Sequence, residues 1–331
     1  MANNSKNTPE QSFLFQLPEP LETRVEPKIK RLRHPVWTEN KAKLIERYLY
    51  YFVLITKHGT YIDGFAGPQE RDKPEMWAAK LVLESEPRWL KHFYLFDADN
   101  RQVDYLRQLK VEQPNRDKKG RKLYRDIKIF DGDFNVLIHN ILRSRCIKQT
   151  EATFCLLDQR TFECHWPTLV ALAQYKESGS NKIELFYFLA VGWLGRALAA
   201  VQDKSILEKW WGRDDWTQLI TMHDRERLAL FVNRFKDELG YKSVLPWPIF
   251  ERQGGGRIMY YMIHATDHEA APGLMARAYE RAVQTKETAE QIEFEFISMP
   301  EAQSLYAESR PLPEVYMDLG EQCVEDNLST S

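Results

Sequence analysis

Four aspartates follow the ends of successive predicted β-strands along the first half of the chain. They are Asp63, Asp97, Asp133 and Asp158. Because ligands of open α/β sheets bind outside the carboxyl ends of the strands, we expect these carboxylates to meet at one sheet edge. Each acid taken alone also fits the N-cap of a following helix, since aspartate is a favoured capping residue. Four in order are harder to explain by capping alone, and they predict a ligand site.

The first acid belongs to the motif Thr60-Tyr61-Ile62-Asp63-Gly64-Phe65-Ala66-Gly67-Pro68, in which an apolar strand runs into a tight loop. Gly64 and Gly67 lie three positions apart, so the motif is not the dinucleotide-binding G-x-G-x-x-G, and it lacks the Gly-Lys-Ser/Thr of a P-loop. An acid with small residues in the turn suits a cofactor that brings a cation and no phosphates, such as S-adenosylmethionine. An ordinary strand-to-helix turn is the alternative for this motif alone.

The order of the acids fits the parts of S-adenosylmethionine. Asp63 can hold the cationic methionine end, and Asp97 is placed to accept both ribose hydroxyls. Asp133 can accept the adenine amino group, with Phe134 available to pack on the ring. A phosphate-bearing cofactor would instead require helix N-termini and basic side chains at these points. The predicted cofactor-binding residues are Asp63, Gly64, Phe65, Ala66, Gly67, Asp97, Asp133 and Phe134.

The fourth acid, Asp158, is expected to face the methyl donor, where a substrate would be held. It opens the stretch Asp158-Gln159-Arg160-Thr161-Phe162. We expect Asp158 to orient the methyl acceptor and Phe162 to pack against it. Methyl transfer needs mainly in-line positioning of donor and acceptor, so a catalytic base is not obligatory. Asp158 and Phe162 are therefore the predicted catalytic residues.

Strands and helices alternate around these acids. The predicted strands cover 61–63, 92–97, 127–130, 154–158 and 183–189, followed by a hairpin of 243–252 and 257–265 joined by Gly254–Gly256. The predicted helices cover 74–83, 101–109, 136–142, 167–173 and 272–283, and a further amphipathic helix with Thr38 as its N-cap precedes the first strand. This alternation indicates right-handed βαβ units and a mainly parallel seven-stranded sheet with helices on both faces, a Rossmann-like α/β fold.

The flanking and inserted segments predict how the chain is divided. Residues 1–35 are polar, proline-punctuated and basic toward their end, which predicts an extended or disordered arm. The α/β domain is expected over 36–285, with a helical insertion at 194–240, and residues 286–331 form a peripheral acidic tail. The insertion carries Trp210, Trp211 and Trp216, which fit core or lid packing better than a base-stacking platform.

Composition is ordinary for a globular protein: 331 residues, 43% hydrophobic and 28% charged, with a net charge of −2. The four cysteines form no C-x-x-C pair, and the spacing around Cys155, Cys164 and His165 matches no zinc pattern, so no metal site is predicted. Few, scattered cysteines are typical of reduced thiols in a cytoplasmic protein. No apolar run approaches the roughly 20 residues that a membrane span requires, and the N-terminus lacks the apolar core of a signal peptide.

Three stretches of the chain resemble the three-Cys-motif partner proteins, a bacterial and phage-associated family with a class I methyltransferase-like fold. They are the helix from Trp37-Thr38-Glu39-Asn40-Lys41 to Tyr50, the loop 61–68, and the stretch Tyr260–His268. The resemblance covers roughly residues 34 to 285. It implies S-adenosylmethionine as cofactor and a partner protein of radical S-adenosylmethionine-like type that bears the three cysteines. The first loop is also similar to that of some ribosomal RNA adenine-N6 methyltransferases.

The chain departs from this family at the predicted acceptor site. The family has Asp-Pro-Phe-Gly after the fourth strand, and amino methyltransferases have Asp-Pro-Pro-Tyr, where this chain has Asp158-Gln159-Arg160-Thr161-Phe162. Asp158 and Phe162 can still serve as acceptor and stacker, although both prolines are missing. Gln69 also replaces the usual glycine after Pro68. Two functions are therefore favoured: a methyltransferase, with nucleic acid as a possible substrate, or a non-catalytic methyltransferase-like subunit that positions a partner in a phage-related or defence system. A third, a nucleotide-binding regulator, is disfavoured by the lack of phosphate-binding chemistry.

Two basic segments are candidate phosphate contacts for such a nucleic acid. The first lies in the arm and the second in a charged loop before the third strand; they comprise Lys28, Lys30, Arg31, Arg33, Lys118, Lys119, Arg121 and Lys122. The net charge of −2 argues against a protein that coats nucleic acid through bulk charge. Ordinary solvated charge is the alternative interpretation of both segments.

Overall fold

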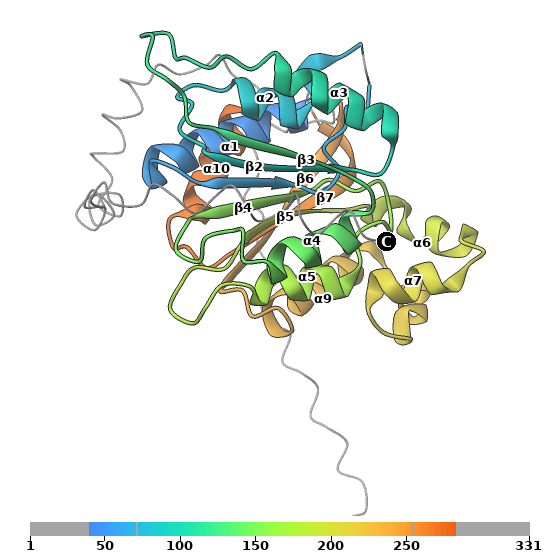
Figure 1. Ribbon diagram of the computed structural model, residues 1–331. Coiled ribbons are helices and arrows are strands. Elements are labelled where there is room, and N and C mark those ends of the chain that lie inside the picture. Colours follow the sequence, from blue (N-terminus) through green and yellow to red (C-terminus); the bar gives the residue numbers. More distant parts are fainter. Residues whose placement is uncertain (1–39, 71, 253–254, 283–331) are drawn as a thin grey trace, which may run out of the picture. The chain divides into compact units, whose positions relative to one another are not determined.

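The computed structural model describes residues 40–70, 72–252 and 255–282. In this part of the chain seven strands form one mixed sheet in the order β3-β2-β1-β4-β5-β7-β6 (Figure 1). The strands are β1 (Thr60–Asp63), β2 (His92–Asp97), β3 (Asp126–Asp131), β4 (Thr153–Leu157), β5 (Glu184–Leu189), β6 (Ser243–Arg252) and β7 (Gly255–Thr266). The first five strands are parallel, whereas β7 runs antiparallel to β5 and β6. The predicted mainly parallel sheet of seven strands is confirmed.

The described helices cover both faces of the sheet. They are α1 (Lys41–Thr56), α2 (Ala78–Glu84), α3 (Asn100–Val111), α4 (Phe134–Arg143), α5 (Trp166–Gln174), α6 (Val191–Ala200), α7 (Lys204–Trp211), α8 (Gln218–Thr221), α9 (Asp224–Asp237) and α10 (Ala271–Arg281). Helices α1, α2, α3 and α10 share one apolar core with the sheet, while α4, α5 and α9 share the other (Figure 1). The central strand β4 is buried along its whole length, as a strand covered on both faces requires.

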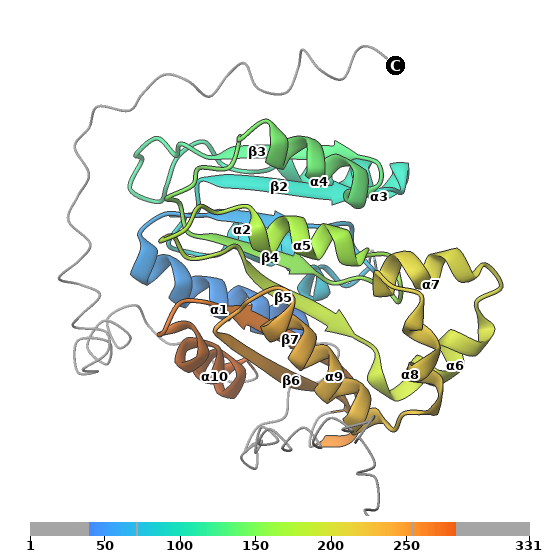
Figure 2. The same cartoon turned by 90° about the horizontal axis from the view of Figure 1, so that it is seen from below.

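Helices α6 and α7 of the helical insertion stand beyond the carboxyl ends of the parallel strands, whereas α9 packs on a face of the sheet. Figure 2 shows these strands pointing toward α6 and α7. The helical insertion predicted for 194–240 consists of four α-helices and a 3-10 turn at Asp215–Thr217. Polar caps interrupt it: Asp203 accepts a hydrogen bond from the Ser205 amide to start α7, and Gly212 ends α7 in the left-handed conformation. Trp210 and Trp211 are buried, which confirms the predicted core packing.

The strand boundaries match the predictions to within one or two residues, but one helix start was wrong. β1 and β2 end at Asp63 and Asp97, and β4 ends directly before Asp158. The helix predicted to begin at Pro74 begins instead at Ala78, because residues 74–76 form a separate 3-10 turn that ends at an extended residue.

Several predictions fall outside the described residues. They concern the arm at 1–35, the N-cap at Thr38 and the tail at 286–331. None of the described helices is long and apolar enough to cross a membrane. None of the three described cysteines forms a disulfide.

Candidate functional site

A cavity of about 720 Å³ opens where the strand order of the sheet reverses. β1 pairs with β2 on one side and β4 on the other, so the chain connections diverge at its carboxyl end. This switch point is where open α/β sheets bind ligands. The cavity is lined by the loops that follow β1, β2, β3 and β4, and by Val201 and Ile206 of the helical insertion. Eight of the ten predicted cofactor-binding and catalytic residues line it: Gly64, Phe65, Gly67, Asp97, Asp133, Phe134, Asp158 and Phe162.

Asp97 connects the first two loops of the cavity. Its Oδ2 accepts a hydrogen bond of 3.0 Å from the Gly67 amide, and its Oδ1 accepts one of 2.9 Å from the Asp99 amide. A carboxylate has about four lone-pair positions, so each oxygen can accept one more donor. Asp97 is thus held in place by main-chain donors and can still receive two hydroxyl groups from a ligand.

The loop after β1 is fixed to the neighbouring strands by its main chain. The Gly64 amide donates to the Leu156 carbonyl over 3.0 Å, and the Ala66 amide donates to the Phe96 carbonyl over 2.8 Å. A Cβ atom at Gly67 would lie 2.5 Å from both Oδ2 of Asp97 and Cβ of Gln102. No real side chain tolerates that approach, so glycine is needed for the loop to pass close to Asp97.

Asp133 acts as the N-cap of α4 and also lines the cavity. Its Oδ1 accepts hydrogen bonds from the Asn135 amide at 2.8 Å and from Nδ2 of Asn135 at 2.9 Å. Its Oδ2 has no hydrogen-bond partner among the described residues, so it can receive a ligand donor. Phe134 is buried against Phe65 and Phe96 and contributes an apolar wall. Capping and ligand binding are therefore compatible at this acid.

Asp63 and Ala66 are buried and do not line the cavity. Side chains on a strand alternate between faces, so Asp63 lies on the same face as Tyr61. The Tyr61 hydroxyl donates to Oδ2 of Asp63 over 2.7 Å, and the Phe65 amide donates to Oδ1 over 3.2 Å. Burial raises the pKa of Asp63 to about 7, although these two hydrogen bonds act in the opposite direction. Asp63 supports the loop from beneath and does not reach the cavity itself.

Asp158 forms a buried ion pair with Lys41, the first residue of α1. The distance from Nζ to Oδ2 is 2.5 Å, and the side chains are 8% and 11% exposed. Nε2 of Gln69 lies 3.4 Å from the same oxygen. Burial alone would lower the pKa of Lys41, but the Asp158 carboxylate and, after it, Tyr260 together more than offset this and raise it. Oδ1 of Asp158 is buried and has no hydrogen-bond partner among the described residues.

Two buried amide side chains hold the turn after Asp158. Oε1 of Gln159 accepts from the Cys164 amide over 2.8 Å, and its Nε2 donates to the Phe188 carbonyl of β5 over 3.2 Å. Asn135 donates to the Glu163 carbonyl over 2.7 Å and accepts from the His165 amide over 2.8 Å. Side-chain hydrogen bonds therefore constrain the turn that follows Asp158.

Phe162 lines the cavity but is largely covered by the helical insertion. It is 7% exposed, and its ring packs edge-to-face on Trp210 with centroids 4.8 Å apart. The adjacent Arg160 lines the cavity and is exposed. Phe162, the predicted stacking residue, thus lines the cavity while its ring also packs against α7.

The predicted phosphate contacts are not brought to the cavity. Lys118, Lys119, Arg121 and Lys122 lie in the loop that leads into the amino end of β3, at the edge of the sheet opposite the cavity. Asp117 organises this loop by accepting from the amides of Lys119 and Arg121. The arm residues Lys28, Lys30, Arg31 and Arg33 lie outside the described residues.

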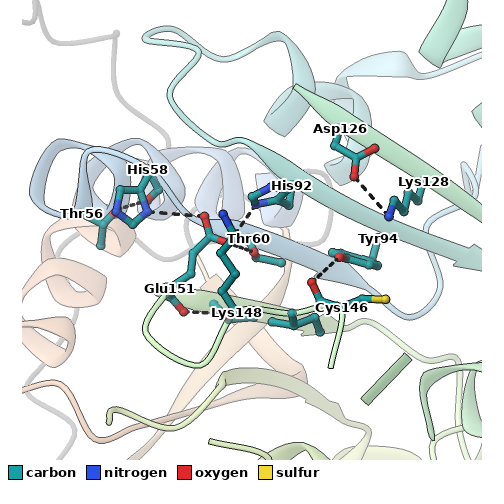
Figure 3. A network of polar contacts seen from close by, with 12 residues as sticks. Thr56, His58, Thr60, His92, Tyr94, Asp126, Lys128, Cys146, Lys148 and Glu151 are labelled. Atoms are coloured by element: carbon teal, nitrogen blue, oxygen red, sulfur yellow. Dashed lines mark hydrogen bonds and ion pairs between the residues drawn. The ribbon is translucent and has the colours of Figure 1, made fainter. Parts of the chain in front are cut away.

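A second polar cluster, centred on Glu151, ties the amino ends of three strands together (Figure 3). Oε2 of Glu151 accepts from Oγ1 of Thr60 and pairs with Nδ1 of His92, both at 2.8 Å, and His58 lies 3.5 Å from Oε1. Burial alone would raise the pKa of Glu151, but its contacts with His58, His92 and Thr60 hold that pKa well below its usual range. Within the described ranges no group of histidine, cysteine and acidic residues could hold a metal ion.

Sequence reasoning missed four residues that shape the site: Lys41, Gln69, Asn135 and Gln159. One feature of the sequence could have indicated that Lys41 has an acidic partner: a basic residue in the first turn of a helix is disfavoured by the helix dipole. Its partner lies on a distant part of the chain and is revealed only by the fold. A scan against protein-family models finds no match to this chain, and a search of curated proteins also finds none.

Proposed function

We propose that this protein is an S-adenosylmethionine-dependent methyltransferase whose cofactor binds in the cavity at the carboxyl ends of β1 to β4. The proposal is carried by one observation: Asp97, Asp133 and Asp158 line one cavity at the switch point, in the order that the cofactor's parts require. Parallel strands in the order 3-2-1-4-5, with the antiparallel β6–β7 hairpin at one edge, support a class I methyltransferase-like fold.

The residues present fit an adenosyl ligand. Gly67 brings the main chain of its loop directly against Asp97, and both line the cavity, so a ligand held by Asp97 would lie beside that main chain. Asp97 can accept the two ribose hydroxyls, and Oδ2 of Asp133 can accept an amino group beside the apolar wall of Phe134. The cavity volume of about 720 Å³ lies in the range of ligand pockets, about 300–1,000 Å³.

The cofactor supplies a methyl group activated by its bond to a positive sulfur. The protein supplies position: Asp97 and Asp133 fix the adenosyl part, and Asp158 lies at the remaining end of the cavity, where the acceptor enters. The helical insertion contributes Val201 and Ile206 to the wall and limits the access of water. In-line alignment of acceptor and methyl group then provides the rate enhancement.

Calorimetric titration with S-adenosylhomocysteine tests the proposal. We expect wild-type protein to bind it and Asp97→Asn to bind it roughly 10–100-fold more weakly, because a hydrogen bond to a charged group contributes about 1.5–3 kcal/mol. Asp131→Asn is the matched control, since Asp131 is paired with Asp97 in the sheet register and lies outside the cavity. Absence of binding to the wild-type protein would sink the proposal.

A second candidate is a non-catalytic methyltransferase-like subunit that binds a three-Cys-motif partner in the bacterial cytoplasm, in a phage-related or defence system. It is favoured by the state of the acceptor end, where Asp158 is paired with Lys41 and Phe162 is packed on Trp210. In that case the partner binds without cofactor, and Asp97→Asn leaves this binding unchanged. Nucleic acid as substrate is part of the first candidate and would be tested by transfer of a labelled methyl group.

A further inference from the structure

Arg160 brings a positive charge to the acceptor end of the cavity. It follows Asp158 by two residues, it lines the cavity, and it is exposed. Among the described residues that line the cavity, it is the only lysine or arginine. No hydrogen bond or ion pair links its guanidinium to another residue within the described ranges. The guanidinium is therefore free to receive an anionic group from a bound molecule.

The main chain on both sides of Arg160 is held in place. Gln159, the residue before it, forms two hydrogen bonds through its buried amide. The amide of Thr161, the residue after it, donates to Oε2 of Glu163 over 2.6 Å. The Glu163 carboxylate is thus directed to the main chain, and it forms no ion pair with Arg160. Because the backbone is already fixed, only the arginine side chain has to be ordered when an anion binds.

Asp158, the acid at this end of the cavity, is poorly placed to act as a base. Its Oδ1 is buried, and its Oδ2 is paired with Lys41. His165 also lines the cavity, and burial lowers its pKa, but it interacts electrostatically with Asp133, at the end assigned to the adenine. An acceptor that has no proton to lose therefore fits this end better than one that needs a base.

The acids of the cavity are compatible with an anion at Arg160. Lys41 offsets the charge of Asp158. Asp97 and Asp133 are assigned to the ribose and the adenine of the cofactor. Bound S-adenosylmethionine also brings a positive sulfur to this end, so an anionic acceptor would be attracted by the sulfur and by the guanidinium.

We propose that Arg160 binds a carboxylate of the substrate and that this carboxylate is the methyl acceptor. A guanidinium presents parallel N–H donors that match the two oxygens of a carboxylate. Arg160 thereby determines substrate specificity, since it selects an acid over an uncharged group of the same shape. This inference rests on the proposed methyltransferase function.

The group transfer balances without another reactant. One oxygen of the carboxylate uses a lone pair to form the new O–C bond, while the bond from the methyl carbon to sulfur breaks and its electron pair stays on sulfur. The negative charge of the acid and the positive charge of the sulfur are lost together, and no proton moves. The products are a methyl ester and S-adenosylhomocysteine.

Two analogues of S-adenosylhomocysteine measure the preference for negative charge at this position by calorimetry. In both, a nitrogen replaces the sulfur and carries a short arm toward the acceptor end. The arm is carboxymethyl in one analogue and carbamoylmethyl in the other, so the arms have nearly the same shape and differ in charge. The change in the ratio of their dissociation constants between wild type and a variant reports the contribution of the substituted residue, because differences between the free ligands cancel.

The arginine variants have distinct expected ratios. Arg160→Gln should reduce the preference for the carboxymethyl analogue at least roughly tenfold relative to wild type. Arg160→Lys keeps the charge but loses the paired donors, so its ratio should lie between these two. Arg196→Gln is the matched control, because Arg196 is exposed on α6 and does not line the cavity; its ratio should stay within about twofold of wild type.

An unchanged ratio in Arg160→Gln, or wild-type protein that binds S-adenosylhomocysteine but not the carboxymethyl analogue, would overturn the inference. The proposed function would still be supported, and an uncharged acceptor such as a nucleobase would remain. If Arg160→Gln weakened S-adenosylhomocysteine more than 5′-methylthioadenosine, which lacks the amino-acid part, Arg160 would bind the carboxylate of the cofactor and the inference would also be overturned. No binding of S-adenosylhomocysteine to wild-type protein would overturn the inference and the proposed function together.

Discussion

At the scale of single residues, the carboxylates of the cavity serve the fold and the site together. Asp97 accepts two main-chain amides, and Asp133 caps α4, yet each keeps lone pairs for a ligand. A polar group held by main-chain donors loses little freedom when a ligand arrives. Capping and binding are therefore not competing explanations of a strand-end acid.

The close approach at Gly67 leads to a prediction. Gly67→Ala places a Cβ 2.5 Å from Asp97 and Gln102, so the loop must shift; we expect a loss of about 1–3 kcal/mol in stability and weaker adenosyl binding. Gly273→Ala is the control, because Gly273 lies in α10 with nothing near its Cβ and should gain about 0.5–1 kcal/mol. Urea unfolding and calorimetry measure both effects. Equal stability changes in the two variants would contradict this reading of the loop.

Asp63 predicts a pH dependence. Its pKa is raised from 3.8 to about 7 by burial, so between these values the folded protein binds a proton that the unfolded chain has released. The stability that this proton contributes is full below about pH 4 and is lost as the pH rises to 7. Relative to Asp63→Asn, wild-type protein should lose up to about 4 kcal/mol of unfolding free energy between about pH 4 and pH 8. If the unfolding free energies of the two proteins, measured in urea, changed with pH in parallel, a raised pKa of Asp63 would be excluded.

At the scale of elements, the turn between β4 and α5 is the feature that most distinguishes this site. Gln159 forms hydrogen bonds with the Cys164 amide and the Phe188 carbonyl. Asn135, in the first turn of α4, donates a hydrogen bond to the Glu163 carbonyl of the turn between β4 and α5. A turn fixed by buried amides presents Asp158 and Arg160 in one arrangement. The turn is constrained by hydrogen bonds that involve α4, β5 and the segment before α5. A proline, in contrast, would constrain only its own backbone.

This arrangement predicts a clear cost for removing one amide. Gln159→Met keeps the volume but leaves the Cys164 amide and the Phe188 carbonyl unpaired, so we expect a loss of about 2–4 kcal/mol in urea unfolding. Gln108→Met is the matched control on the exposed surface of α3 and should change stability by less than about 0.5 kcal/mol. A Gln159→Met protein as stable as this control would show that the turn does not depend on the amide.

The sequence predicted the strands and helices more completely than the side-chain contacts between them. Alternating strands and helices predicted the sheet, and strand ends predicted that Asp97, Asp133 and Asp158 would share an edge. The same alternation could have placed Asp63 on the Tyr61 face, away from the cavity. Lys41 and Gln159 could not be assigned, because Asp158, which follows β4, and Phe188 on β5 become their neighbours only when the sheet forms.

At the scale of the whole described domain, the two edges of the sheet differ in chemistry. The carboxyl edge holds the cavity and its acids, while the amino edge holds the Glu151 cluster and the basic loop 118–122. The basic loop 118–122 and the aspartates that line the cavity thus lie at opposite ends of the strands. A polyanion held at the basic loop would not lie over the cavity.

The separation of the edges leads to a prediction about the basic loop. Replacing Lys118, Lys119, Arg121 and Lys122 with serine should leave the affinity for S-adenosylhomocysteine within about twofold, since no charge at the cavity changes. If the loop contacts nucleic acid, the same variant should weaken binding to RNA and flatten its dependence on salt. Calorimetry and fluorescence anisotropy at several salt concentrations measure the two effects. A large loss of adenosyl affinity would contradict the separation of the two edges.

The most direct test of the proposed cofactor site is a crystal structure of the protein grown with S-adenosylhomocysteine. We expect both ribose hydroxyls within about 3 Å of the Asp97 carboxylate, and the adenine between Asp133 and Phe134. The sulfur should point toward Asp158 and Lys41. An adenosyl group bound elsewhere, or a cavity that excludes it at saturating concentration, would contradict the assignment of this cavity to S-adenosylmethionine.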